Sequence, residues 1–285
     1  MNLTIQHFFD TATSTLTYVV WDADTLDAVI IDPVLDFDSV NLIFSETAID
    51  RVLEFIALKQ LTVRHVLETH IHADHITGAS RLREKMGVKL VVGSSVSKIQ
   101  DTFVEMLNMD KTHVNTDVFD VLLGDNEVLY SGSLMIKAIH TPGHTPACTT
   151  YQIGDAIFTG DTLFMPDFGT GRCDFPNGSA ETLYESIQQL YLLPDSTRVF
   201  VGHDYQPGGR ELQFETSIGI CKTESKNLRV DTLKEEFIAF RDTRDASLNL
   251  PRLLFQSVQL NICAGALPPK SSNGTRMMSI PILGD

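Results

Sequence analysis

The spacing of apolar and polar positions along the chain predicts short strands and helices in two successive blocks. Strands rich in β-branched and aromatic residues are predicted at 3–8, 15–21, 28–31, 63–67 and 88–92. Amphipathic helices are predicted at 39–60, 76–86 and 94–107, and Gly87 stops the second of them. The first block therefore opens with strands and then alternates helices with strands.

The second block repeats the order of strands followed by a helix. Its strands are predicted at 128–130, 134–140, 148–153, 156–158 and 199–201, and its helix at 180–192. Beyond Gly209 the pattern becomes mostly helical, at 211–241 and 251–263. This order predicts an α/β fold with two sheets sandwiched between helices, an αββα sandwich. We expect one domain over 1–210 and a mostly helical C-terminal extension over 211–285 packed on it.

Four candidate metal ligands follow the predicted strand at 63–67 within six residues: His70, His72, Asp74 and His75. In an extended segment, residues two apart share a face, so His70, His72 and Asp74 are expected to converge on one point. A turn at Asp74 would bring His75 beside them. Neutral imidazole and carboxylate together suit zinc, iron or manganese. Solvated surface histidines are the alternative, and so dense a cluster disfavours it.

Three further candidates stand at predicted strand ends: His144, Asp161 and His203. Each signal is weak alone, because an aspartate after a strand most often makes a turn or caps a helix. Loops at strand ends commonly carry function, however, and all three follow the histidine cluster in this position. The sequence therefore predicts one metal centre assembled from these loops.

Composition narrows the class of partner. The chain of 285 residues carries 22 basic and 37 acidic residues, a formal net charge of −15, which disfavours nucleic acid. No apolar run approaches the roughly 20 residues of a membrane helix, and no apolar leader is apparent after Met1. The four cysteines lack paired spacing. A cytoplasmic protein without a membrane segment is the expectation.

These motifs together resemble the metallo-β-lactamase superfamily, over roughly residues 1–210. The resemblance implies an αββα catalytic domain and two metal positions. It places His70, His72 and His144 at one metal, Asp74, His75 and His203 at the second, and Asp161 between them. Such a full set would favour two zinc ions and a hydrolase of glutathione thioesters, like glyoxalase II.

The stretches 72–78, 169–175 and 244–254 instead resemble the bacterial type of the persulfide dioxygenase (sulfur dioxygenase) branch. That resemblance implies one Fe(II) per chain held by a 2-His-1-carboxylate set at His70, His144 and Asp161. The remaining four candidates, which are His72, Asp74, His75 and His203, would orient those ligands or donate hydrogen bonds. The implied reaction is oxidation of glutathione persulfide by O2 and water to sulfite and glutathione, in sulfide detoxification.

Contacts to the substrate are predicted from isolated residues. Tyr205, Arg210 and Arg252 are candidates to bind a glutathione carboxylate, and Arg172 is a further one. The alternative for Arg172 is a structural ion pair with Asp174. Cys173 is expected to be a small buried residue, with a redox role as the alternative. A homodimer and a sulfurtransferase of the same pathway are the expected partners, and a non-catalytic metal or sulfur sensor on this fold is a third possible function.

Overall fold

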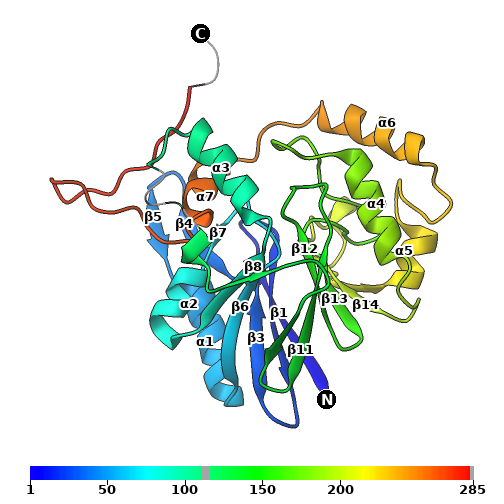
Figure 1. The fold of residues 1–285 in the computed structure, drawn as a ribbon, viewed down its shortest axis with the longest axis horizontal. Helices are drawn as coiled ribbons and strands as arrows, with labels where there is room; N and C mark the ends of the chain where they lie inside the picture. Colours follow the sequence, from blue (N-terminus) through cyan, green and yellow to red (C-terminus); the bar gives the residue numbers. More distant parts are fainter. Residues whose placement is uncertain (111–113, 115, 283–285) are drawn as a thin grey trace.

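The computed structural model describes residues 1–110, 114 and 116–282, so the last three residues of the predicted extension lie outside the described residues. Two six-stranded sheets stack face to face, with helices on both outer faces, and a third small sheet lies at one end (Figure 1). The first sheet has the order β1-β2-β3-β6-β8-β9. Its strands are β1 (Leu3–Asp10), β2 (Thr15–Asp22), β3 (Asp27–Ile31), β6 (Thr62–Glu68), β8 (Lys89–Gly93) and β9 (Val121–Leu123).

The second sheet runs from β10 to β15 in sequence order. Its strands are β10 (Val128–Ser131), β11 (Leu134–His140), β12 (Thr149–Ile153), β13 (Ala156–Phe158), β14 (Arg198–Phe200) and β15 (Glu215–Ser217). The small sheet has the order β5-β4-β7, with β4 (Val34–Asp38), β5 (Ile43–Ser45) and β7 (Ile76–Thr77). The predicted αββα sandwich is confirmed.

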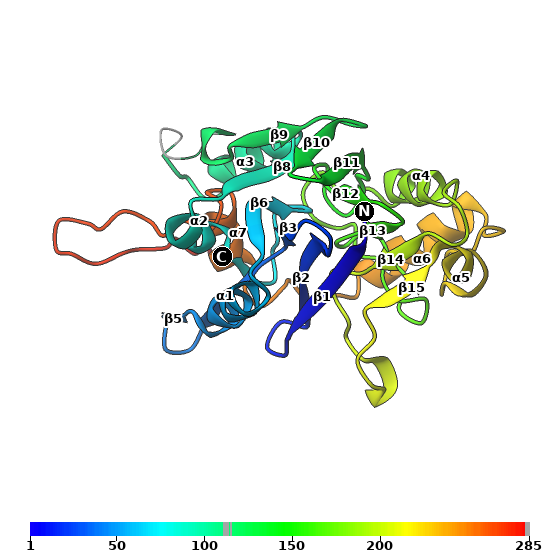
Figure 2. The same cartoon turned by 90° about the horizontal axis from the view of Figure 1, so that it is seen from below.

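Helices cover the outer faces of both large sheets, as the view from below shows (Figure 2). The first sheet is covered by α1 (Thr47–Lys59), α2 (Ala79–Met86), α3 (Val96–Met106) and α7 (Leu254–Asn261). The second is covered by α4 (Ala180–Leu190), α5 (Ile218–Glu224) and α6 (Lys234–Asp245). Short 3-10 turns lie at η2 (Thr116–Val118) and η3 (Pro207–Gly209).

The buried strand β2 shows why the sandwich has two apolar layers. Its side chains alternate, so that Tyr18 and Val20 pack into the layer between the sheets. Val19 and Trp21 point the opposite way, into the layer under α1, α2 and α3. All eight residues of β2 are buried, which is typical of a strand covered on both faces.

Two predicted helices begin with strands. The predicted helix at 39–60 contains β5 before α1 begins, because the aromatic rings of Phe37 and Phe44 pair across β4 and β5 with centroids 4.6 Å apart. The predicted helix at 76–86 begins as β7, which pairs with β4. The strands β4 and β9 were not predicted either.

The stretch at 211–241 was predicted to be mostly helical, and this prediction is wrong for the first part of the stretch. It contains β15, which pairs with β14 and extends the second sheet. The prediction of a domain boundary at 210 stays a prediction, although residues beyond it complete this sheet. Among the described residues, no helix is both long enough and apolar enough to cross a membrane.

Candidate metal centre

The candidate ligands gather at one edge of the sandwich, where four loops leave the strands. His70 to His75 follow β6, His144 follows β11, Asp161 follows β13 and His203 follows β14. The strands β3 and β6 are parallel, as are β13 and β14. Parallel strands end at the same edge, so the sheet pairing brings these loops together.

Glycine allows two of these loops to approach closely. Gly160 has φ +49°, and a Cβ on it would lie 2.4 Å from Thr69 Oγ1. A Cβ on Gly202 would lie 2.9 Å from the Gly160 carbonyl carbon. Any side chain at these positions would push the loop of Asp161 away from those of His70 and His203.

The first donor group consists of His70, His144 and Asp161, which are all buried. One ligand atom from each lies within 4.8 Å of the others. The distance from His144 Nε2 to Asp161 Oδ2 is 3.6 Å. Two imidazoles and one carboxylate thus converge on a single point, in the combination that the persulfide dioxygenase resemblance implies.

The second donor group consists of His72, Asp74 and His75, whose ligand atoms also lie within 4.8 Å of one another. His203 joins it, because its Nε2 lies 3.3 Å from Asp74 Oδ2 and 3.3 Å from Asp161 Oδ1. His72 lies next to His70, with ring centroids 4.1 Å apart. The chain leaves the strand after Glu68, so the extended geometry expected for this run is wrong and its donors divide between the two groups.

Buried polar atoms without a hydrogen-bond partner indicate whether a metal ion fits between the two groups. Among the described residues, five buried ligand atoms of these two groups have no hydrogen-bond partner: His70 Nε2, His72 Nδ1, Asp74 Oδ2, His75 Nε2 and Asp161 Oδ1. The two carboxylate oxygens have only the 3.3 Å ionic contacts with His203 Nε2. Buried polar atoms without partners are costly and rare, and here they all face the same region. A bound cation would satisfy them, so the residues fit a metal.

Hydrogen bonds behind the first group fix which nitrogen carries the proton. Thr69 Oγ1 donates to Asp32 Oδ2 (2.7 Å), so it accepts from His70 Nδ1 (3.0 Å). His144 Nδ1 donates to the carbonyl oxygen of Arg172 over 2.6 Å. Both imidazoles are therefore held with the Nε2 lone pair directed at the metal position.

The second group is backed by carboxylates. His72 Nε2 donates to Glu68 Oε2 (3.0 Å) and Asp32 Oδ1 (3.2 Å), which leaves Nδ1 for a metal. Thr77 donates its hydroxyl to Glu68 as well. Behind His75, Nδ1 lies 3.3 Å from Thr15 Oγ1. His72 and His75 therefore each have one nitrogen occupied and one without a hydrogen-bond partner.

The groups behind His70 and His72 shift the pKa values of these neighbouring histidines in opposite directions. Burial holds the pKa of His70 well below its ordinary value, so this imidazole is neutral. Burial lowers the pKa of His72 too, but Asp32 and Glu68 outweigh it and that pKa lies well above its ordinary value. Burial in turn raises the pKa of Glu68. His70 thus presents a lone pair without losing a proton, whereas His72 must lose one.

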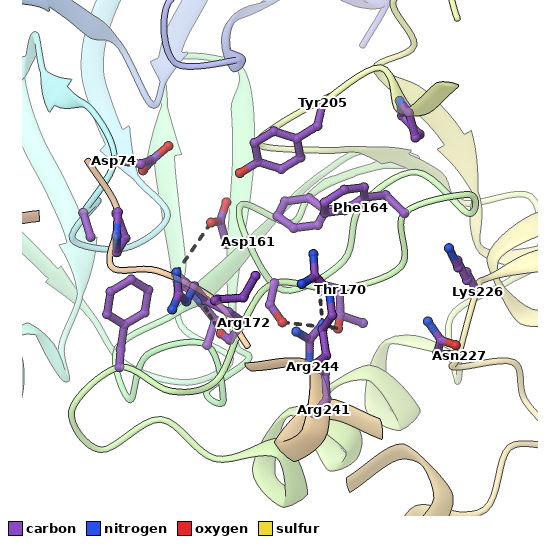
Figure 3. Close-up of a pocket in the computed structure, with 18 of the residues that line it drawn as sticks. Asp74, Asp161, Phe164, Thr170, Arg172, Tyr205, Lys226, Asn227, Arg241 and Arg244 are labelled. Atoms are coloured by element: carbon purple, nitrogen blue, oxygen red, sulfur yellow. Dashed lines mark hydrogen bonds and ion pairs between the residues drawn. The ribbon is translucent and has the colours of Figure 1, made fainter. Parts of the chain in front are cut away.

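A cavity of about 610 Å³ opens from the metal position. Asp74 and Asp161 lie toward one end of it, and Lys226 and Asn227 lie at the opposite end (Figure 3). Aromatic rings line its wall, from Phe164, Phe168, Phe175, Tyr205 and Phe240. Its basic side chains are Arg172, Lys226, Arg241, Arg244 and Arg252. This acidic protein therefore presents a cationic cavity, which suits a small anionic ligand.

Of the four residues predicted to contact the substrate, three line the cavity and one does not. Arg172, Tyr205 and Arg252 line the cavity, and their role in binding stays a prediction. Arg210 is not among the lining residues, because its guanidinium pairs with Asp204 at 2.7 Å and Asp167 at 2.6 Å. The substrate contact predicted for Arg210 has no geometric support.

Arg172 and Cys173 have structural partners. Arg172 makes two hydrogen bonds of 2.5 Å to the carboxylate of Asp174, which is the ion pair considered as its alternative, while still lining the cavity. Cys173 is buried, and burial raises the pKa of its thiol to about 12. A thiol with so high a pKa is unreactive near neutral pH, which favours the packing role expected for Cys173.

The residues that orient the candidate ligands were not predicted from the sequence. Asp32, Glu68 and Asn261 hold the metal loop, and none of them was singled out. Asp32 carries a weak signal, since an aspartate directly before Pro33 ends a strand and here adopts φ +48°. Asn261 gives a comparable signal as an amide between Leu260 and Ile262 in a buried helix. Lys226 lies in a segment without a recognisable motif, and Arg244 opens the stretch 244–254 but was not itself predicted to bind the substrate.

Comparison with known proteins agrees with this geometry. Residues 10–203 match the metallo-beta-lactamase superfamily, and the chain belongs to this family of metal-dependent αββα proteins. A probable metallo-hydrolase of Burkholderia pseudomallei is 40% identical over 98% of this chain and 99% of its own. The mitochondrial persulfide dioxygenase ETHE1 of Mus musculus is 30% identical over 94% of this chain and 91% of its own.

Among solved structures, the crystal structure of ETHE1 from Myxococcus xanthus superposes with a TM-score of 0.75. It is 32% identical, and the match covers 92% of this chain and 100% of that one. The resemblance to the persulfide dioxygenase branch is thus confirmed at the level of sequence and fold. The relatives carry both hydrolase and dioxygenase names, so the names leave the reaction to be argued from the site.

Proposed function

We propose that this chain is a mononuclear non-haem iron persulfide dioxygenase that oxidises glutathione persulfide with O2 and water to sulfite and glutathione. One observation carries the proposal. The donors of His70, His144 and Asp161 lie within 4.8 Å of one another at one end of a cationic cavity, in a chain 30% identical to ETHE1 of Mus musculus. Two histidines and one carboxylate are a ligand set that would hold Fe(II) and leave it accessible to O2 and to the sulfur anion, as oxygen-activating sites require.

The residues around the triad have distinct roles in this proposal. Thr69 and the Arg172 carbonyl oxygen orient the imidazoles of His70 and His144, respectively. The second donor group, including His203, borders the site and orients Asp161 through the 3.3 Å contact between His203 Nε2 and Asp161 Oδ1. Phe164 and Phe175 line the cavity with apolar surface and exclude water from the reacting sulfur.

The cationic end of the cavity supports glutathione as the carrier of the sulfur. Glutathione carries two carboxylates, and a cavity of about 610 Å³ lies within the usual range for small-molecule sites. In the described part of the chain, Lys226, Arg244 and Arg252 form no ion pair, so they are available to an anionic ligand. A persulfide is more acidic than a thiol and arrives largely as the anion, so the protein need not supply a base.

A dinuclear zinc hydrolase of glutathione thioesters is the second candidate. The specific observation in its favour is the second donor group of His72, Asp74 and His75, which together with His203 offers ligands for a second metal, although His72 was expected at the first metal. The probable metallo-hydrolase of Burkholderia pseudomallei, at 40% identity, supports it further. Both candidates bind glutathione, and they differ in whether a sulfur anion or a carbonyl approaches the metal.

One preparation decides between the two candidates. Protein from cells supplied with both iron and zinc is analysed for metal, and is then given glutathione persulfide in an oxygen electrode and S-lactoylglutathione in a thioester absorbance assay. We expect about one iron per chain, O2 uptake with sulfite release, and little thioester cleavage. Two zinc ions with rapid thioester cleavage and no O2 uptake would overturn the proposal.

The physiological setting extends the same proposal. A persulfide is the product of sulfur transfer to a thiol, so an enzyme of the sulfurtransferase class is the partner that would supply the substrate. Reduced glutathione is abundant in the cytoplasm, which is where we place the reaction, and a homodimer remains the expected assembly. Size-exclusion chromatography with light scattering tests the assembly, and a coupled assay with a purified sulfurtransferase tests the supply.

A further inference from the structure

The far C-terminal part of the chain reaches the metal loop through one buried amide. Asn261 is the last residue of α7, and its side chain is 1% exposed. Its Nδ2 donates to the carbonyl oxygens of His72 and His75, each over 2.8 Å. Its Oδ1 accepts from the backbone N–H of Thr77 over 2.9 Å. This one side chain therefore satisfies three backbone groups of the loop that carries the second donor group.

We infer that Asn261 is a positioning residue for the metal centre, and that α7 serves as the template for the turn from His72 to Thr77. The turn is short, and within it two ligating side chains must point to one place while Asp74 projects between them. Bridging the carbonyls of His72 and His75 with one NH2 group fixes the distance between those two backbone positions, and with it the origins of both imidazoles.

Neighbouring contacts make the template rigid. Just after Asn261, the carbonyl oxygen of Ala264 accepts from both the backbone N–H (3.1 Å) and the hydroxyl (2.8 Å) of Ser80. Gly265, with φ +78°, lets the chain pass the Thr77 carbonyl so closely that a Cβ would lie 2.3 Å from that oxygen. The end of α7 is thus attached to both sides of β7. The inference holds for either candidate reaction, because it concerns the loop and not the substrate.

Gln259 offers a matched control on the same helix. It is also buried, at 6% exposure, and also uses its amide to hold backbone, but it contacts Ser279 and Phe255 instead of the metal loop. Replacing it tests what a lost amide does to the packing of α7 alone. Asn261→Asp is the sharpest test variant, because it keeps the shape and the acceptor for Thr77 N–H but removes both donated hydrogen bonds.

Cobalt(II) is the probe, added to metal-free protein and followed by its visible absorption and by competition with a chelator. For Asn261→Ala and Asn261→Asp we expect the most weakly bound cobalt ion to bind about 10- to 100-fold more weakly than in the parent protein. Its absorption band should also be shifted. Gln259→Ala should stay within about threefold of the parent protein, even where its unfolding temperature falls. Equal binding by all four proteins, or equal weakening in all three variants, would overturn the inference.

Hydrogen exchange on the unchanged protein gives an answer even where the Asn261 variants fail to fold. Cobalt loading should slow exchange of the Thr77 amide and of the end of α7, because the amide of Asn261 couples the two. The peptide of α5, none of whose residues lines the cavity, serves as the reference. Unchanged exchange at both Thr77 and the end of α7 on cobalt loading would overturn the inference.

Discussion

The two donor groups use the same residue types but are built differently. His70, His144 and Asp161 come from three separate loops, and neutral groups, a hydroxyl and a carbonyl oxygen, orient the two imidazoles. His72, Asp74 and His75 come from a single turn, where Asp32 and Glu68 both accept from the imidazole of His72.

That difference has a consequence for metal affinity. Two carboxylates around one imidazole favour its protonated form, and a metal must displace that proton before it can bind. His70 is held neutral by burial and needs no such step. We therefore expect the first group to be the stronger site, bordered by the second. Identical ligand types thus do not imply equal occupancy, because the groups behind the ligands set the affinity.

The largest expected effect comes from removing the first group. His70→Ala, His144→Ala and Asp161→Ala should each abolish iron binding and lower activity by more than about a hundredfold, because three ligands leave no redundancy. Iron content by elemental analysis and O2 uptake are the measurements. His140→Ala is the control, since its imidazole bonds the Leu123 carbonyl oxygen away from the centre. An iron content equal to that of the parent protein in any of the three variants would contradict the assignment of iron to the first donor group.

A smaller effect is expected from the second group. His72→Ala and His203→Ala should keep most of the iron while activity falls about 10- to 100-fold, the usual cost of losing an orienting group. The same two measurements apply. Iron lost from these variants as completely as from His70→Ala would mean that both groups bind metal equally and would favour the dinuclear reading.

The number of protons released on metal binding is expected to differ between the two donor groups. The pKa of His72 is raised by Asp32 and Glu68 against burial, and that of His203 by Asp161 and Asp74 against burial. The imidazoles of His72 and His203 hold a proton at pH values below their raised pKa. The affinity of the second group for a metal ion should therefore rise with pH, by about tenfold per pH unit for each proton displaced. The first zinc equivalent should depend less on pH between roughly 6 and 8, because the pKa of His70 is lowered.

Calorimetric titration with zinc in two buffers of different ionisation enthalpy measures those protons. We expect more protons released by the second equivalent than by the first. The reverse order would show that the carboxylates behind His72 do not weaken its group, and would remove the physical reason for ranking the two sites.

The smallest effect is expected from two exposed basic side chains that line the cavity. Lys226→Glu and Arg244→Glu should each raise KM for glutathione persulfide about three- to tenfold with little change in kcat, because the proposed function assigns these cavity-lining side chains to the carrier and not to the reacting sulfur. Iron content should not change. Arg51→Glu, on exposed α1 outside the cavity, is the charge-matched control. A fall in kcat alone would place these side chains at the chemistry instead.

Much of the fold and of the candidate site could be read from the sequence, because the signals are local. Period-two apolar runs predicted most strands, and glycine correctly ended the helix at Met86. The strand errors arose where short segments take their conformation from pairing, as β5 and β15 do. The metal cluster was also local, since four donors follow a single strand and the other three follow strand ends.

What the sequence determined by itself was the identity and order of the candidate ligands and the layer architecture, since both depend on neighbours in the chain. The tertiary structure alone decided how those ligands divide and how each is oriented. Asp32 reaches His72 across 40 positions of sequence and Asn261 across 189. No periodicity encodes such contacts, because a hydrogen bond between distant segments exists only after the sheets and α7 have packed.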